Sequence, residues 1–444
     1  MKATVPLLVH GGTVVPMTRR GLSLPADVLV DGGRIAAIGT ALEVPAGTER
    51  LDARGCLVLP GFVQAHVHVV QSLARHRAEG LPLLRWLTER IWPYEAALAP
   101  AETSAAARLG IAELLAGGTT TALDMGSAHH HDEVFGAAEA LGIRLVSGKC
   151  LMDQGAGVPA GLLEEPDAAL AETERLGARW HGAAGGRLRY AVAPRFILSC
   201  SRRVLEGAAE LARRHGWLLQ THAAENPEET RLVRERTGRG NVAALADLGL
   251  TGPDCVLAHC VHLDPGEVRS LAAHSTGVAH CPGANLKLAS GIADLPGLLA
   301  AGVRVGLGAD GPPCNNRLSV FHEMALAGTV HNLRSGPGAV DPWAVLELAT
   351  CRGAEVVGLG SEVGRLAPGC RGDLVVLDPP WAAEPPADAA TMVVYGGGVE
   401  SVRDVIVDGA PVVLGRRLTT DSAGAIRREA RAAASALDTR LGWT

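Results

Sequence analysis

The sequence predicts an α/β fold: a (β/α)₈ TIM barrel with a small composite β-sandwich domain formed by both chain ends. Two observations support this fold class. Eight apolar, strand-like segments alternate with helix-like segments in the middle of the chain, which is typical of a parallel barrel. Short β-like runs separated by glycine turns fill both flanks. The predicted boundaries are therefore 1–57 and 367–444 for the two parts of the sandwich and 58–366 for the barrel.

Both flanks are expected to form antiparallel strands. Residues 4–57 alternate short runs rich in Val, Leu and Ile with the turn signals Gly11-Gly12 and Asp31-Gly32-Gly33. Each flank is too short to enclose a core alone, so we expect the two to pair. The helical composition of residues 423–441 predicts a terminal helix. The C-terminal flank has β-like runs at 373–378, 392–395 and 405–409.

The central region supplies the strands of the predicted barrel. Most of them are followed by helical segments rich in Ala, Leu, Glu and Arg, such as 203–215 and 265–274. A doubly wound open sheet is the alternative, but no GxGxxG motif follows an early strand. The segment 69–100 is longer than an ordinary βα loop, and we expect it to lie over the barrel mouth. The candidate strands are 56–68, 119–126, 143–149, 188–196, 218–225, 255–261, 277–283 and 303–310.

Composition narrows the range of partners and compartments. Hydrophobic residues make up 47% of the 444 positions and charged residues 20%, which suits a globular chain with a large core. A net charge of −6 without a basic stretch argues against nucleic acid or a membrane surface as a partner. Nine scattered cysteines without a CxxC motif, and no recognisable signal peptide, predict a reducing cytoplasm.

Polar side chains close several of the apolar runs, where burial makes an unpaired polar group costly. His66 and His68 lie two residues apart on the first strand and point to the same side. His222 closes the fifth strand and Asp310 the eighth. Barrel enzymes carry their chemistry at these strand ends, and three histidines with one carboxylate suit zinc or ferrous iron. We predict one divalent metal, with zinc preferred over iron, held by these four residues.

Three further polar residues follow the strand ends. Glu225 lies three residues after His222, so it can reach over the metal without binding it, and a partly desolvated carboxylate there can move protons. His259 on the sixth strand is predicted to donate a hydrogen bond to the reacting centre, with a fifth metal ligand as the alternative. His280 on the seventh strand either joins the site or shapes the following turn, and both roles stay open.

The candidate residues lie in motifs that are spread along the chain. These motifs are Pro60-Gly61-Phe62 with His66-Val67-His68, Thr221-His222-Ala-Ala-Glu225, Ala258-His259-Cys260, His280-Cys281-Pro282 with Asn285-Leu-Lys-Leu, Gly308-Ala-Asp310-Gly, and Gly364-Arg-Leu-Ala-Pro-Gly369. The set resembles the amidohydrolase superfamily, in particular the branch of deaminases and chlorohydrolases that includes guanine deaminase, S-adenosylhomocysteine deaminase and the triazine hydrolases. The resemblance implies one divalent metal, a barrel with a composite sandwich, and a homodimer or higher homo-oligomer. Relatives with two metals carry a carboxylated lysine on strand four, whereas Lys149 here closes strand three.

The resemblance also points to substrate contacts. Gln71, in the pattern HxHxxQ, and Arg195, in Pro-Arg-Phe, resemble residues that hold the purine in guanine deaminase. A glutamine amide pairs with both a donor and an acceptor, and a guanidinium offers a planar fork. A rim salt bridge for Arg195 and a solvated loop position for Gln71 are the alternatives. Three further candidate contacts are closer to the S-adenosylhomocysteine and triazine members: Trp86, Trp92 and Asn315.

The predicted activity is hydrolytic deamination of an aminated N-heterocycle, with a guanine-like purine as the preferred substrate. In this hypothesis Asp310 and Glu225 share the proton of the attacking water, His259 stabilises the oxygen, and Glu225 protonates the ring nitrogen and the departing ammonia. The first alternative is an adenosine-type nucleoside such as S-adenosylhomocysteine or methylthioadenosine, and the second is a triazine. A catalytically inactive scaffold is disfavoured because every candidate ligand is present.

Overall fold

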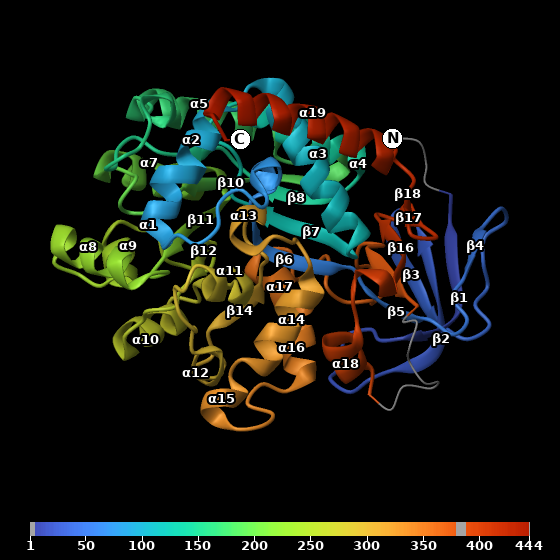
Figure 1. The fold of residues 1–444 in the computed structure, drawn as a ribbon. Coiled ribbons are helices and arrows are strands. Elements are labelled where there is room, and N and C mark those ends of the chain that lie inside the picture. The colour runs from blue at the N-terminus through green and yellow to red at the C-terminus, as the bar shows by residue number, and fades with distance from the viewer. Residues whose placement is uncertain (1–4, 379–387, 444) are drawn as a thin grey trace.

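Eight parallel strands form the predicted barrel in the computed structural model, which describes residues 5–378 and 388–443 (Figure 1). The two edge strands of the path meet where Val67 forms a parallel bridge with Asp310. The amide of Asp310 donates to His66 O (3.1 Å), and that of His68 donates to Asp310 O (3.3 Å). In path order the strands are β6 (Phe62–Val67), β7 (Thr119–Asp124), β8 (Arg144–Ser147), β10 (Leu188–Pro194), β11 (Leu218–Ala223), β12 (Cys255–His259), β13 (Gly277–His280) and β14 (Arg304–Leu307), and β9 (Cys150–Leu151) pairs with β10.

The predicted strand 56–68 is wrong as a single element. It is two strands in different sheets: β5 (Leu57–Pro60) belongs to the sheet of the chain ends, and β6 begins at Phe62. Gly61 joins them at a point where a Cβ atom would lie 2.2 Å from the side chain of Thr120, so only glycine fits. The apolar run is continuous because both strands are buried, and periodicity therefore does not reveal the break.

The chain ends form a second sheet of nine strands. Strand β5 joins its two halves, because it pairs in parallel with β1 (Leu7–Val14) and antiparallel with β15 (Leu374–Leu377). The predicted pairing of the two flanks is therefore confirmed. Side chains from both halves of this sheet share one hydrophobic core. The order is β18 (Arg417–Leu418), β17 (Ala410–Leu414), β16 (Val402–Val407), β15 (Leu374–Leu377), β5, β1 (Leu7–Val14), β2 (Leu24–Asp31) and β3 (Arg34–Gly39), and β4 (Glu49–Asp52) pairs with β1.

The predicted β-like run 392–395 is helical instead. It forms the π-helical turn η4 (Met392–Gly396) directly after α18 (Ala389–Thr391). Asp388 caps this segment by accepting a hydrogen bond from the amide of Thr391 (2.8 Å). A short apolar run fits a buried strand or a buried helix equally well, so the pattern alone does not distinguish them.

Helices surround the barrel, and α7 (Arg202–His215) and α10 (Pro265–Ala273) lie where the sequence predicts them (Figure 1). The predicted terminal helix is α19 (Ala423–Leu441), which packs along α3. The other helices from α3 to α17 are α3 (Pro100–Ala116), α4 (His131–Leu141), α5 (Pro166–Trp180), α6 (Ala183–Gly186), α8 (Pro227–Thr237), α9 (Asn241–Asp247), α11 (Pro282–Lys287), α12 (Leu295–Ala300), α13 (Pro312–Asn315), α14 (Val320–Thr329), α15 (Asn332–Ser335), α16 (Pro342–Leu348) and α17 (Cys351–Val356).

The long segment after β6 covers the carboxyl ends of the strands, as predicted. It runs through η1 (Val69–Ala74), α1 (Leu83–Trp86), the π-helical turn η2 (Leu87–Ile91) and α2 (Trp92–Ala97). We call residues 81–98 the lid segment. The hydroxyl of Tyr94 donates to Val70 O (2.7 Å), and Arg77 forms an ion pair with Asp438 of α19 (2.6 Å). The first contact fixes the lid segment to η1, and the second fixes the chain just before the lid segment to the terminal helix.

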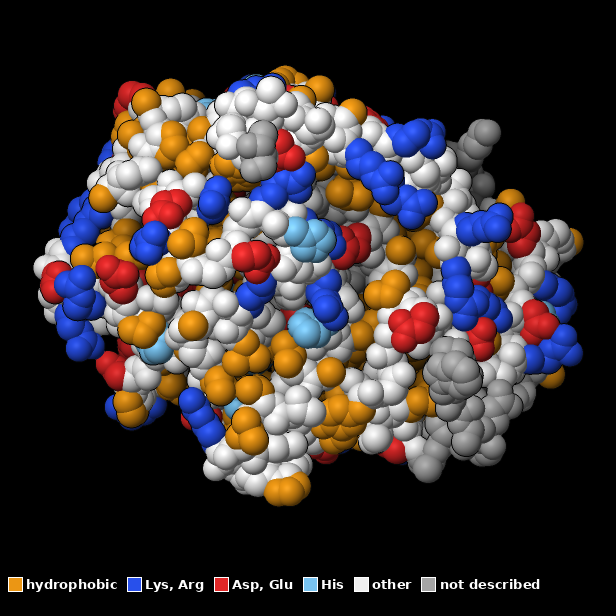
Figure 2. Space-filling model, in the orientation of Figure 1, with side chains coloured by type: hydrophobic (Ala, Val, Ile, Leu, Met, Phe, Trp, Pro, Cys, Tyr) orange, Lys and Arg blue, Asp and Glu red, His pale blue; other side chains and the backbone are white. Residues whose placement is uncertain are grey.

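The surface carries both signs of charge. On the face drawn in Figure 2, Lys and Arg side chains lie among Asp and Glu side chains rather than in one block. Within the ranges 5–378 and 388–443, no helix has both the length and the apolar character needed to cross a membrane.

Candidate metal centre and substrate pocket

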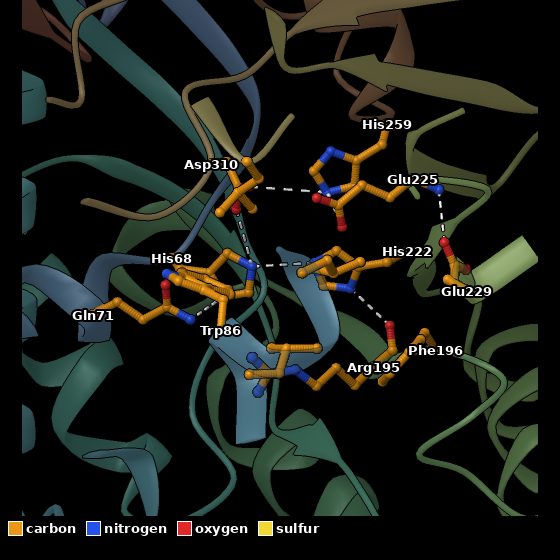
Figure 3. A pocket seen from close by; sticks show the side chains of 13 residues that line it. His68, Gln71, Trp86, Arg195, Phe196, His222, Glu225, Glu229, His259 and Asp310 are labelled. Carbon is orange, nitrogen blue, oxygen red and sulfur yellow. Dashed lines mark hydrogen bonds and ion pairs between the residues drawn. The ribbon is translucent and has the colours of Figure 1, made fainter. Parts of the chain in front are cut away.

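Side chains from four strand ends converge at the barrel mouth, as the sequence predicts (Figure 3). His68 Nε2 lies 3.2 Å from His222 Nε2 and 3.4 Å from Asp310 Oδ1. His66 Nε2 lies 3.5 Å from the same carboxylate oxygen. One donor atom from each of His66, His222, His259 and Asp310 lies within 4.8 Å of the others. The structure therefore brings five candidate donors into one His/Asp site.

The donor atoms fit a divalent metal. The buried Nε2 atoms of His66 and His259 make no hydrogen bond within the described residues, an arrangement that is costly unless another group satisfies them. His222 Nδ1–H donates to Arg195 O (2.7 Å), which leaves its Nε2 lone pair facing the cluster. Imidazole nitrogens with one carboxylate oxygen are a donor set for zinc. Despite burial, His66 and His259 hold the pKa of Asp310 well below its usual value, so it is a carboxylate.

His259 differs from the other histidines in its partners. Its Nδ1–H donates to Asn285 Oδ1 (2.8 Å), while Nε2 lies 3.5 Å from Glu225 Oε2 and 3.9 Å from Asp310 Oδ2. Burial opposes the imidazolium, but Glu225 and Asp310 raise the pKa of His259 above its ordinary value. A histidine between two carboxylates is suited to donating a hydrogen bond, as well as to binding a metal.

Backbone geometry at the strand ends is unusual. His259 (φ 74°), Cys260 (φ 50°) and Asp310 (φ 58°) occupy the left-handed region, which costs free energy for residues with a side chain. Gly308, two residues before Asp310, packs so closely on β6 that a Cβ atom would lie 2.5 Å from His66 O. The fold therefore accepts local strain where these side chains are aimed at one point.

Glu225 has the environment of a proton-transfer group. It is fully buried in the site, and burial raises the pKa of its carboxyl to about 7, although the nearby His259 acts in the opposite direction. Ser290 Oγ donates to Glu225 Oε1 (3.4 Å). Because this pKa lies near neutrality, the carboxyl is able both to accept and to release a proton there.

Glu229 positions Glu225, a role that was not predicted. Its carboxylate accepts hydrogen bonds from the amide of Glu225 (2.7 Å), the amide of Asn226 (3.3 Å) and the side chain of Asn241 (2.7 Å). Asn226 and Glu229 form a capping box at the start of α8. The spacing Asn-x-x-Glu was a sequence signal for this arrangement. Ser290 and the Asn285–His259 hydrogen bond had no comparable signal.

A small cavity of about 30 Å³ lies between the strand ends and the lid segment. Four of the predicted substrate contacts line it: Gln71, Trp86, Arg195 and His259. The apolar residues around them are Leu83, Leu87, Phe196 and Leu288. Trp92 does not line this cavity, because it packs in the apolar core of the lid segment and faces a separate outer groove of about 710 Å³. Asn315 also lies elsewhere: its amide donates to Ala309 O (2.9 Å) and to Glu323 (2.7 Å).

The two predicted purine contacts are joined by a carboxylate for which no role was predicted. Glu95, in the lid segment, accepts a hydrogen bond from Gln71 Nε2 (2.8 Å) and forms an ion pair with Arg195. Although burial opposes the charge, Glu95 raises the pKa of the Arg195 guanidinium. The salt bridge that was the alternative prediction for Arg195 is therefore present. The solvated position that was the alternative for Gln71 is not, because Gln71 is buried.

His280 and Lys149 lie outside this cluster of donors. His280 is buried without a hydrogen bond from either ring nitrogen to a described residue, and burial lowers the pKa of His280 to about 3. The ammonium of Lys149 contacts Ala128 O (2.5 Å) and the carboxylate of Glu164. Lys149, just after β8, therefore connects the loops that contain Ala128 and Glu164.

Comparisons with known proteins assign the chain to a family. The pattern of the Amidohydrolase family matches residues 57–412. A 5-methylthioadenosine/S-adenosylhomocysteine deaminase of Desulforudis audaxviator is 36% identical over 437 residues, covering 96% of this chain and 98% of that protein. The structure of a Xanthomonas campestris adenosine deaminase with bound zinc superposes with a TM-score of 0.91, at 28% identity over 98% of this chain and 99% of that one. Escherichia coli guanine deaminase superposes with a TM-score of 0.83, also at 28% identity, over 92% and 99%. The chain belongs to the amidohydrolase family and is a hydrolase that acts on carbon–nitrogen bonds.

Proposed function

We propose that the protein is a metal-dependent deaminase of adenosine-type nucleosides, with 5-methylthioadenosine and S-adenosylhomocysteine as its preferred substrates. The name and near-complete coverage of the Desulforudis audaxviator relative support this proposal. It corrects the prediction of a guanine-like purine and promotes the nucleoside alternative. Water would replace the amino group on the purine ring, and ammonia would leave.

The observation that carries this choice is the position of Glu95. An oxopurine needs donors for its ring carbonyl, but Glu95 accepts from the side-chain amide of Gln71 and from one guanidinium nitrogen of Arg195, the two residues predicted for that task. A carboxylate is instead a good acceptor for ribose hydroxyl groups, as in dinucleotide-binding folds. We therefore assign the ribose to the Glu95 side of the pocket, beneath the lid segment.

We assign the metal to His66, His68, His222 and Asp310. His259 is left outside this set because its Nε2 also faces Glu225, and the raised pKa of His259 suits it to donating a hydrogen bond. Zinc bound there would supply a Lewis acid that makes water nucleophilic at neutral pH. The zinc in the Xanthomonas campestris structure supports this metal over iron.

Three residues would move or hold protons. Glu225, whose pKa is raised to about 7, would accept one proton from water and deliver it to the ring nitrogen. It would then carry the second proton of that water, released from the new hydroxyl group as the ring carbonyl forms, to the leaving amine. His259 would donate a hydrogen bond to the new oxygen, since its Nε2 faces the centre. Asp310 would hold the water in place from the opposite side.

We infer from the size of the cavity that the lid segment moves. Pockets that hold drug-sized ligands usually measure about 300–1,000 Å³, whereas this cavity measures about 30 Å³. Leu83, Trp86 and Leu87 supply its cover from the lid segment, so their displacement would admit the nucleoside. On closure the same side chains would pack on the purine and exclude water.

The test is ammonia release by the zinc-loaded enzyme. The substrates are 5-methylthioadenosine, S-adenosylhomocysteine, adenosine, free adenine, guanine, 8-oxoguanine, pterin and melamine. We expect the nucleosides to give the highest kcat/KM, and free adenine to be at least about tenfold poorer because it lacks the ribose. Activity on guanine or 8-oxoguanine without activity on any nucleoside would refute the proposal.

A further inference from the structure

Cys314 contacts the carboxylate of Asp310 directly. Its Sγ lies 3.2 Å from Asp310 Oδ2 and 3.0 Å from Gly311 O, and the side chain is fully buried. The two carboxylate oxygens thus have different neighbours: Oδ1 faces His66 and His68, whereas Oδ2 faces the thiol. A thiol is a weak hydrogen-bond donor, and an ionised carboxylate is a strong acceptor for it.

The chain around Cys314 is built to hold it at this place. Pro312 and Pro313 occupy the first two positions of α13, where their fixed φ favours a helical turn. This turn returns residue 314 over residue 310. Asn315 then anchors the turn through hydrogen bonds to Ala309 O (2.9 Å) and Glu323 (2.7 Å). The predicted substrate residue Asn315 therefore supports the strand end rather than lining the cavity.

Hydrogen bonds to the first barrel strand also hold the backbone of Asp310 in place. Its amide donates to His66 O, its carbonyl accepts from His68, and its φ of 58° lies in a narrow allowed region. With the backbone fixed, only side-chain torsions decide which oxygen faces the histidines. Within the described residues, Cys314 is the side chain other than histidine that donates to Oδ2.

We propose that Cys314 is a positioning residue: its S–H donates to Asp310 Oδ2 and thereby presents Oδ1 to the metal. Hydrogen-bond partners of ligating carboxylates commonly change metal affinity by roughly ten- to a hundredfold when they are removed. This inference rests on the metal ligands assigned under the proposed function. It goes beyond them because Cys314 is not one of the assigned ligands and does not line the cavity.

The test compares Cys314→Ala, which removes the donor, with Cys314→Ser, which replaces the thiol by a hydroxyl. The matched control is Cys281→Ala, because Cys281 is equally buried near the site but its thiol donates to a backbone carbonyl, Ala279 O (3.6 Å), where Cys314 contacts a carboxylate oxygen. For each metal-free protein, the zinc dissociation constant is measured by competition with a chromophoric chelator. The thermal unfolding midpoint without metal reports any general loss of packing.

We expect Cys314→Ala to weaken zinc binding by at least about tenfold, Cys314→Ser to stay within about threefold of wild type, and Cys281→Ala to leave it unchanged. Wild-type affinity in Cys314→Ala would overturn the inference alone, and so would equal weakening in the Ala and Ser variants. If the wild-type chain bound no zinc, both this inference and the assigned metal centre would fall. The two failures are therefore distinguishable.

Discussion

Replacing Glu225 by Gln tests the proton-transfer step in two independent ways. Glutamine keeps the shape of the side chain but cannot exchange a proton, so turnover should fall by at least about a hundredfold while zinc content stays unchanged. Because the pKa of Glu225 is about 7, wild-type kcat/KM should fall about tenfold for each pH unit below that value, if its carboxylate is the base. That limb of the pH profile should be absent in the variant.

The same pKa predicts an effect on stability in the metal-free protein. A rise in the pKa from 4.5 to about 7 corresponds to about 3 kcal/mol of penalty on the buried carboxylate, to order of magnitude. The folded state favours the protonated form of Glu225. The contribution of this carboxyl to the free energy of unfolding is therefore fully present below pH 4.5 and is lost as the pH rises through about 7. Glu225→Gln should therefore match wild type near pH 4.5 and unfold at a higher temperature near pH 9.

The assay is ammonia release across pH 5.5–9, together with zinc analysis and thermal unfolding after chelation. Glu228→Gln is the matched control, because Glu228 is an exposed carboxylate in the first turn of α8 and should leave turnover within about twofold of wild type. Loss of zinc in Glu225→Gln would make Glu225 a ligand. An unchanged acid limb would show that another group is the base.

Three further predictions follow from the geometry of the site and the fold. His66→Ala or Asp310→Ala should abolish both zinc binding and turnover while the circular dichroism spectrum stays close to wild type, since both residues lie at the strand ends. Arg195→Lys should raise KM for the nucleoside by at least about tenfold with unchanged zinc content, because the flexible lysine ammonium would hold Glu95 in place less rigidly than the planar guanidinium; an unchanged KM would show that Arg195 does not support substrate binding. Arg144→Ala should destabilise the protein by about 3–5 kcal/mol in chemical denaturation, because it leaves buried Asp373 unpaired across the two sheets (2.8 Å); a loss below about 1 kcal/mol would contradict this reasoning.

The positions of the candidate ligands could be predicted because of a simple topological fact. All parallel strands of a barrel end at the same rim, so polar residues that close separate apolar runs must meet there. His66, His222 and Asp310 come from strands far apart in sequence yet lie within a few ångströms. Nothing about their side-chain packing was needed for that step.

Contacts that depend on packing between distant segments could not be predicted in the same way. Glu95 reaches Gln71 and Arg195 only because the lid segment folds back over the strand ends. No periodicity in the sequence encodes that approach. The break at Gly61 was hidden for a related reason: two buried strands of different sheets give the same uninterrupted apolar pattern as one.

The pairing of β5 with β15 has a consequence for the growing chain. β5 is made early, but the strand that covers one of its edges is separated from it by about three hundred residues, the whole length of the barrel. Until that partner leaves the ribosome, Leu57–Pro60 exposes an apolar edge with unpaired amides, the kind of edge that recruits other chains. The strand that carries His66 continues directly from this edge. The first strand of the metal centre is therefore made next to an exposed edge that favours aggregation. That edge is covered only after β15 has been synthesised.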